Sequence, residues 1–169
     1  MQLDMSFWEN VKQEDRFYPE SVHRFKLEPL KKFYQIVKSP EIINEGIISL
    51  ISLDVDDIAF KWTGYMVFEQ SLHSLQYSPG VYCYDPHFSG RLLHDCSPNL
   101  RLEMSTLTAY VIKPIRPFDR ITCDYEATET DGLFNSFQCS CQAKDDKGNS
   151  VCKGWISGGK KEIILDKKI

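Results

Sequence analysis

Four of the six cysteines have positions that suit the binding of one metal ion. Two lie in the run Phe137-Gln-Cys139-Ser-Cys141, a third begins the run Cys152-Lys-Gly154-Trp-Ile156, and the fourth is Cys96. A Cys-x-Cys pair is a poor disulfide, but thiolates two residues apart can point at one ion, and zinc binds four ligands with Zn–S bonds of about 2.3 Å. The pattern therefore predicts a zinc site. Ordinary thiols or a disulfide framework are the alternative.

The length and the N-terminal sequence bound the class of protein. A chain of 169 residues is long enough for one domain that buries a core without disulfides. The first residues show neither the basic nor the apolar region of a signal peptide, and no apolar run approaches the roughly 20 residues of a membrane span. We therefore expect an intracellular protein, cytoplasmic or nuclear, with no membrane contact. In a reducing compartment, clustered cysteines favour metal binding or catalysis over disulfides.

The formal net charge is −4. Excess negative charge disfavours contact with a phosphate backbone, so we expect no direct nucleic-acid binding, and it suits a cationic substrate. Solubility alone explains a charge of this size more simply.

The hydrophobic pattern predicts a mainly β domain with irregular connections and almost no long helix. A short helix is expected to start at 19–25, the segment 66–76 is ambiguous, and a hairpin is expected around Ser105-Thr106. The predicted strands are 33–38, 46–52, 57–62, 80–84, 100–104, 107–112 and 120–125.

The order of the motifs resembles that of a SET domain with a post-SET zinc tail, over roughly residues 33–158. The segments that carry the resemblance are His94-Asp-Cys96-Ser-Pro98-Asn99, Ile121-Thr-Cys-Asp124-Tyr125, the two cysteine runs, Asn44-Glu-Gly46-Ile-Ile-Ser and Phe60-Lys-Trp62-Thr-Gly64-Tyr65. The resemblance implies small β-sheets around a pseudoknot. It divides the chain into an N-terminal extension (1–32), a SET-like domain (33–136), a zinc-binding tail (137–158) and a C-terminal extension (159–169).

The resemblance also implies an activity, which is methyl transfer from S-adenosylmethionine to a lysine ε-amine of a protein. The residues implied to bind the cofactor are Asn44, Glu45, Gly46, Leu93, His94 and Trp155. For His94, a purely structural role as a buried histidine is an equal alternative.

Tyr125 stands where the family has its essential tyrosine. An SN2 methyl transfer needs a neutral amine held in line with the sulfonium and away from water. A phenol with an ordinary pKa near 10 is a weak base, so orientation and electrostatics are the expected roles. The alternative is a tyrosine that caps a strand in the core.

Four residues are implied to line the substrate channel: Trp62, Cys123, Phe134 and Phe137. A tryptophan could attract a lysine through cation–π contact, although a place in the core is slightly favoured for Trp62. The two phenylalanines could instead cover a hydrophobic edge.

The chain departs from the family pattern near the expected cofactor and channel. Leu93 replaces an asparagine, Asn44 a glycine, Cys123 a phenylalanine or tyrosine, and Tyr65 an acidic residue. These changes keep two alternatives open: an enzyme of this fold that acts on a small-molecule amine with altered chemistry, and a zinc-stapled binding module without catalysis. The sequence names neither the substrate nor the oligomeric state.

Overall fold

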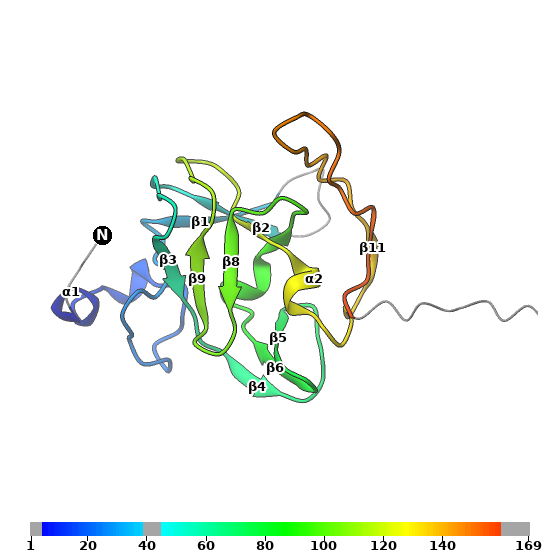
Figure 1. Ribbon diagram of the computed structural model, residues 1–169. Coiled ribbons are helices and arrows are strands. Elements are labelled where there is room, and N and C mark those ends of the chain that lie inside the picture. The colour runs from blue at the N-terminus through cyan, green and yellow to red at the C-terminus, as the bar shows by residue number, and fades with distance from the viewer. Residues whose placement is uncertain (1–4, 39–44, 160–169) are drawn as a thin grey trace, which may run out of the picture.

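The computed structural model describes residues 5–38 and 45–159 (Figure 1). The helical elements are α1 (Met5–Glu9), α2 (Tyr125–Thr128) and two 3₁₀ turns, Gln13–Asp15 and Ser89–Arg91. The strands are β1 (Tyr34–Lys38), β2 (Glu45–Ser49), β3 (Ile58–Lys61), β4 (Tyr65–Val67), β5 (Ser74–Ser78), β6 (Val81–Tyr84), β7 (Leu93–His94), β8 (Leu100–Glu103), β9 (Thr108–Val111), β10 (Thr122–Cys123), β11 (Phe137–Gln138) and β12 (Trp155–Ile156).

The strands form small separate sheets, as the sequence predicts for a mainly β domain. In the described part of the chain, two sheets have three strands, in the orders β3-β9-β8 and β4-β6-β5, and three are two-stranded: β1-β2, β7-β10 and β11-β12. The predicted hairpin is confirmed, because β8 and β9 pair in antiparallel fashion from Leu100 opposite Val111 to Glu103 opposite Thr108.

Two local predictions are wrong, and each has a physical cause. No helix forms at 19–25, because the Arg16 guanidinium donates hydrogen bonds to the carbonyl oxygens of Pro19 and Val22 and holds this segment as turns. The strand predicted for 120–125 ends at Cys123, because the Asp124 carboxylate accepts a hydrogen bond from the backbone N–H of Glu126 and caps α2. The ambiguous segment 66–76 contains part of β4 and of β5 and no helix.

Aromatic side chains build the centre of the main core. The rings of Tyr34, Phe60 and Phe88 pack with centroids 5.0–5.6 Å apart, and each of these residues is at most 2% exposed. The geometry is edge-to-face, which the ring quadrupoles favour. The core therefore joins β1 and β3 to the loop before the second 3₁₀ turn.

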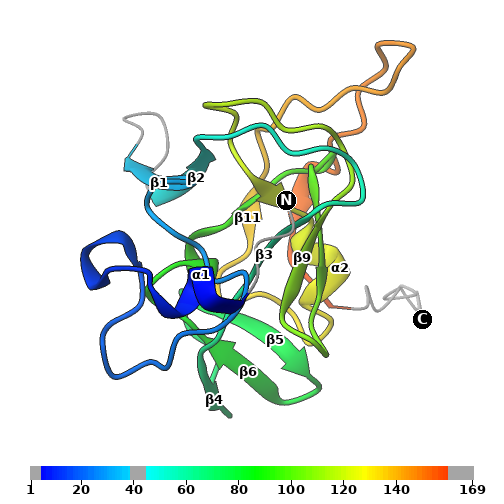
Figure 2. The same cartoon turned by 90° about the vertical axis from the view of Figure 1, so that its left-hand side faces the viewer.

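The N-terminal segment packs on this core (Figure 2). Tyr18 is buried in the core, and its hydroxyl donates a hydrogen bond to the buried Asp85 carboxylate over 2.9 Å. Arg16 and Glu28 form an ion pair at 2.9 Å with side chains 1% and 0% exposed. Burial raises the pKa of Glu28, and the Arg16 guanidinium opposes that rise. The Tyr18–Asp85 bond therefore ties the predicted extension to the β-domain, and the Arg16–Glu28 pair joins two parts of the extension.

The pair β7-β10 positions several of the predicted site residues. The two strands are parallel, with Leu93 opposite Thr122 and His94 opposite Cys123. Asn99 fastens the same two segments, since its side chain donates to the Arg120 carbonyl and accepts from the Thr122 N–H. This pairing brings the His94 motif beside the residue that begins α2, Tyr125.

Over the described residues, none of the helices has the length and apolar character needed to cross a membrane.

Candidate functional site

The four cysteines predicted to bind zinc come together. Their sulfur atoms all lie within 4.8 Å of one another, and all are free thiols. The Sγ atoms of Cys96 and Cys139 are 3.8 Å apart. A disulfide needs about 2.05 Å, whereas a tetrahedral zinc with 2.3 Å bonds to sulfur separates its ligands by about 3.8 Å. The arrangement of Cys96, Cys139, Cys141 and Cys152 thus fits one zinc ion.

His94 connects this thiol cluster to Tyr125. Its Nδ1 accepts a hydrogen bond from the Tyr125 backbone N–H at 3.1 Å, so the ring proton belongs on Nε2. That Nε2 lies 3.2 Å from the Cys96 Sγ and donates to it. The His94 side chain is 1% exposed, and burial lowers its pKa, which favours the neutral ring that this bonding requires.

Tyr125 begins α2 with its ring inside the protein. Its hydroxyl donates a hydrogen bond to the Leu92 carbonyl oxygen over 2.5 Å. The ring packs on His94 and Phe137, with centroids 5.4 and 6.2 Å away. Burial raises the pKa of Tyr125 far above its ordinary value, so the phenol stays neutral. A neutral phenol can orient and stabilise a reacting group through hydrogen bonds, but it is too weak a base to remove a proton from that group.

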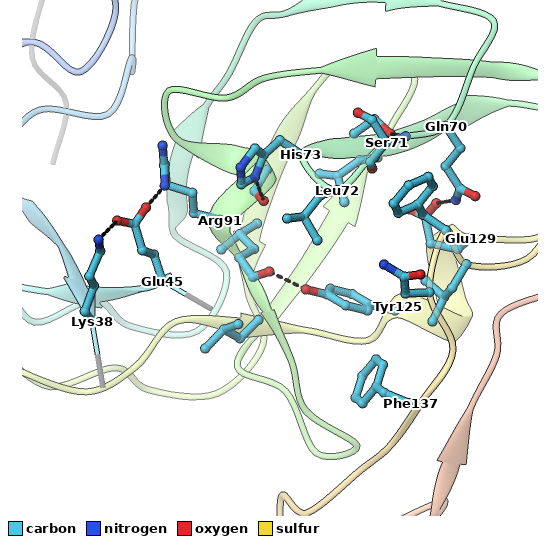
Figure 3. Close-up of a pocket in the computed structure, with 18 residues that line it drawn as sticks. Lys38, Glu45, Gln70, Ser71, Leu72, His73, Arg91, Tyr125, Glu129 and Phe137 are labelled. Atoms are coloured by element: carbon cyan, nitrogen blue, oxygen red, sulfur yellow. Dashed lines mark hydrogen bonds and ion pairs between the residues drawn. The ribbon is translucent and has the colours of Figure 1, made fainter. Parts of the chain in front are cut away.

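A cavity of about 620 Å³ opens beside this tyrosine (Figure 3). Its volume lies within the range of about 300–1,000 Å³ that is usual for small-ligand sites. Among the predicted site residues it gathers Glu45, Leu93, Tyr125, Phe134 and Phe137. The remaining lining residues are Lys38, Gln70, Ser71, Leu72, His73, Ser74, Leu75, Gly90, Arg91, Leu92, Glu129, Leu133 and Asn135.

One side of the cavity is charged. The Glu45 carboxylate forms ion pairs with Lys38, whose Nζ is 3.4 Å away, and with Arg91. In Figure 3 this group and the Gln70–Glu129 pair lie on opposite sides of Tyr125. The cavity therefore has two polar ends with the Tyr125 hydroxyl between them.

Gly46, next to Glu45 in β2, allows a close approach of the Leu93 side chain. A Cβ atom at this position would lie 2.7 Å from the Leu93 Cδ1, so any side chain here would displace Leu93. The Leu93 side chain fills the space that Gly46 leaves free. Leu93 also lines the cavity, where it offers no hydrogen bond.

Two residues implied to line the channel lie in the core, which is the place slightly favoured for Trp62. Trp62 is 3% exposed and packs edge-on against Phe60, and Cys123 is 1% exposed. Neither lines the cavity. Burial raises the pKa of the Cys123 thiol, so it stays protonated. An aromatic residue at the end of a strand has no sequence mark that tells a channel wall from a core.

Three other predicted cofactor residues, Gly46, His94 and Trp155, are described by the structure and do not line the cavity. The His94 ring packs against the Tyr125 ring, with centroids 5.4 Å apart. Trp155 lies in β12 of the tail and is 55% exposed. Asn44 lies outside the described residues. The tail runs past α2 in Figure 1, and Phe137 is the tail residue that reaches the cavity.

Sequence reasoning missed the part of the wall formed by 70–75 and the polar residues Arg91 and Glu129. Their chain positions carry no motif. The one available signal was that Glu129 follows Tyr125 by one helical turn, which places both on one side of a helix. That signal depends on knowing that a helix begins at Tyr125.

Comparison with known proteins shows the fold. No protein-family model and no curated protein matches the chain. Among solved structures, KRYPTONITE in complex with mCHH DNA, H3(1-15) peptide and SAH matches 79% of this chain with a TM-score of 0.55 and 15% identity. KRYPTONITE in complex with mCHG DNA and SAH matches 75% of it with a TM-score of 0.54 and 14% identity. The matches span only 30% and 29% of those longer chains.

Both of these structures are of KRYPTONITE, a SET-domain protein, and the described residues of this chain are mainly β with few helices. The cysteine cluster near the C-terminus lies where a zinc-binding post-SET tail belongs. The chain therefore has the SET-domain fold.

Proposed function

We propose that this protein is a methyltransferase that uses S-adenosylmethionine and transfers a methyl group to an amine. The observation that carries the proposal is the placement of Tyr125. Its neutral hydroxyl is held on the Leu92 carbonyl at the wall of a ligand-sized cavity, between two polar ends. A sulfonium methyl group carries partial positive charge, and a carbonyl and a phenol present oxygen atoms to such a group.

Zinc in this proposal is structural. Cys96, Cys139, Cys141 and Cys152 would supply all four ligands, so the ion would be coordinatively closed. Cys96 belongs to the segment after β7, and the other three belong to the tail. The ion would therefore fasten the tail to the domain and hold Phe137 in the cavity wall.

The cofactor would supply an electrophilic methyl group on sulfur. Within the wall, the Glu45 carboxylate and the Arg91 guanidinium match the ammonium and carboxylate of its amino-acid end. Gly46, Leu93, His94 and Trp155 remain proposed contacts, together with Asn44. Leu93 cannot accept or donate a hydrogen bond, so we expect weaker binding than an asparagine would provide.

The residues of this chain have separable roles in the transfer. Tyr125 and the Leu92 carbonyl orient the reacting centre, and neither changes protonation state. Phe137 and Leu133 exclude water from the same cavity. Positioning and dehydration of this kind are major sources of rate in a bimolecular displacement.

The acceptor is proposed to be a lysine of a protein, with a small-molecule amine as the alternative. A KRYPTONITE complex contains an H3(1-15) peptide, which supports a protein acceptor by analogy of fold. Both KRYPTONITE complexes also contain DNA, so the expectation of no nucleic-acid binding has no support from the comparisons.

The test is transfer of a trideuterated methyl group from labelled S-adenosylmethionine. Zinc-loaded protein is incubated separately with a lysine-containing peptide mixture and with a mixture of small amines, and mass spectrometry identifies the labelled product. Label in peptides supports the lysine acceptor, and label in small amines supports the alternative. Absence of label from both mixtures, together with absence of cofactor binding, would identify a non-catalytic module and overturn the proposal.

A further inference from the structure

Glu129 is a buried carboxylate in the wall of the cavity. The residue is 2% exposed and follows α2 directly, with its backbone N–H donating to the Tyr125 carbonyl at 2.8 Å. It therefore stands one helical turn beyond Tyr125. Figure 3 shows it with Gln70 on the side of Tyr125 away from Glu45.

Neutral groups alone donate to this carboxylate among the described residues. One oxygen accepts from the Gln76 backbone N–H at 3.0 Å and from the Thr128 hydroxyl at 3.2 Å. The other accepts from the Gln70 Nε2 at 3.1 Å. Within 5–38 and 45–159, Glu129 forms no ion pair with any lysine, arginine or histidine.

The other ionised side chains of the described cavity wall, Lys38, Arg91 and Glu45, form one cluster on the other side of Tyr125. Lys38 and Arg91 both pair with Glu45. The nitrogen Nδ1 of His73 lies 3.1 Å from the Gly90 carbonyl oxygen, which it can bond as a donor. Glu129 is thus the charged residue of this described wall that lacks an opposite charge.

A carboxylate buried without a cation is unfavourable, because three neutral hydrogen bonds replace only part of its hydration. Burial raises the pKa of Glu129, and the nearby Asp131 raises it further. A cationic ligand would relieve both effects, since an opposite charge stabilises the ionised form. The cavity therefore favours a positively charged guest at this end.

We propose that the Glu129 carboxylate binds the methyl acceptor as its ammonium ion, and that the acceptor is an alkyl amine with an unbranched aliphatic stem. The bound ammonium would release its proton to solvent before transfer. The lone pair of the neutral amine would then form the new N–C bond as the methyl–sulfur bond breaks and the sulfonium leaves as a neutral thioether. The proposal rests on the proposed function, because it places this amine beside Tyr125. The stem would lie on the apolar wall formed by Leu72, Leu75 and Phe134. Leu72 and Phe134 are 54% and 55% exposed, so this wall extends to solvent and gives the stem a route in.

A purely structural Glu129 would make a different prediction. Its accepted hydrogen bonds from Gln70 and Gln76 connect the loop before β5, and β5 itself, to the end of α2, and this connection alone needs no charge. Glu129→Gln keeps the shape of the side chain and one acceptor oxygen, and removes the charge. A structural role therefore predicts an effect on stability without discrimination between charged and neutral guests.

The experiment measures binding of n-butylammonium chloride and of 1-butanol, a neutral probe of similar shape, to the zinc-loaded full chain by ligand-observed NMR. We expect the unaltered protein to bind the cation at least about tenfold more tightly, as a charge-assisted hydrogen bond requires. Glu129→Gln should remove this preference. Asp131→Asn is the matched control, because it removes an exposed negative charge nearby and keeps an acceptor for the Gly80 N–H.

Equal binding of the two probes to the unaltered protein overturns the inference, and so does a preference that survives in Glu129→Gln. The comparison of the two probes on the unaltered protein needs no variant. The inference can therefore be refuted even if the Glu129→Gln protein does not fold. The proposed function is tested by separate measurements of cofactor binding and methyl transfer. If that function fails, the unaltered protein neither binds S-adenosylmethionine nor transfers its methyl group, whatever the probes show.

Where an amine acceptor is in hand, the same variant gives a kinetic readout. Glu129→Gln should raise the KM for the amine by about tenfold or more and leave the affinity for S-adenosylmethionine unchanged. An unchanged KM with a lower kcat would assign Glu129 a structural role and contradict the inference.

Discussion

Replacing Tyr125 with phenylalanine removes one hydroxyl and keeps the ring that packs on His94 and Phe137. The change breaks the hydrogen bond to the Leu92 carbonyl. One such bond contributes about 0.5–1.5 kcal/mol to the free energy of unfolding. A domain with about 5 kcal/mol of stability remains more than roughly 99% folded after that loss. Stability therefore cannot account for a large fall in activity.

The expected fall in methyl transfer is more than about 100-fold. Each tenfold loss of rate corresponds to about 1.36 kcal/mol, so this fall represents about 2.7 kcal/mol or more of transition-state stabilisation. The assay is single-turnover methyl transfer to a verified acceptor. Urea denaturation and zinc content are measured on the same preparation, and neither should change beyond the loss of one hydrogen bond.

Tyr34→Phe is the matched control. The Tyr34 hydroxyl also donates to a backbone carbonyl, that of Ala59 at 2.6 Å, and it lies in the core away from the cavity. This variant should lose similar stability and keep its rate within about twofold. If Tyr125→Phe slows transfer no more than Tyr34→Phe, the Tyr125 hydroxyl is only structural and the reacting centre lies elsewhere.

Three further predictions follow from the described contacts. Cys139→Ser should lower the zinc content below one ion per chain, and the segment after Phe137 should become sensitive to protease before the β-domain unfolds; unchanged zinc by elemental analysis would contradict the ligand set. Leu93→Asn should tighten S-adenosylmethionine binding by about 0.5–1.5 kcal/mol in calorimetry, whereas unchanged or weaker binding would remove position 93 from the cofactor site. Arg16→Met should lower the free energy of unfolding by about 3–5 kcal/mol in urea, because it leaves the Glu28 carboxylate buried without its cation. The double variant with Glu28→Leu should recover most of that loss, and a single variant of full stability would show that the pair is not needed.

The sequence predicted the strand-rich fold because alternation and β-branched residues mark short strands well. Hairpin β8-β9 and the Cys139–Cys141 pair followed from local spacing, whereas Cys96 was added to the quartet through its place in the His94–Asn99 motif. The helical start at Tyr125 did not, because it depends on Asp124 capping one turn in preference to a longer strand. Local propensity does not decide between those outcomes when the segment is only a few residues long.

The candidate site was predictable where a motif marks a residue and not where burial decides its role. Tyr125 was placed by its motif, and the structure puts it in a cavity wall. Trp62 and Cys123 carried the same kind of motif position, and packing places both in the core. Glu129 had no motif, and its interest comes from a buried carboxylate that pairs with no cation within the described ranges 5–38 and 45–159. That property depends on side chains far apart in the chain, such as Gln70 and Gln76.

Calorimetric titration of the zinc-loaded protein with S-adenosylmethionine tests the central claim most directly. The account predicts saturable binding of about one cofactor per chain, retained in Tyr125→Phe because that hydroxyl bonds to the Leu92 carbonyl and acts on the reacting centre. No heat of binding up to millimolar cofactor, in the unaltered protein and in Leu93→Asn alike, would contradict a methyltransferase and leave a zinc-stapled module of the same fold.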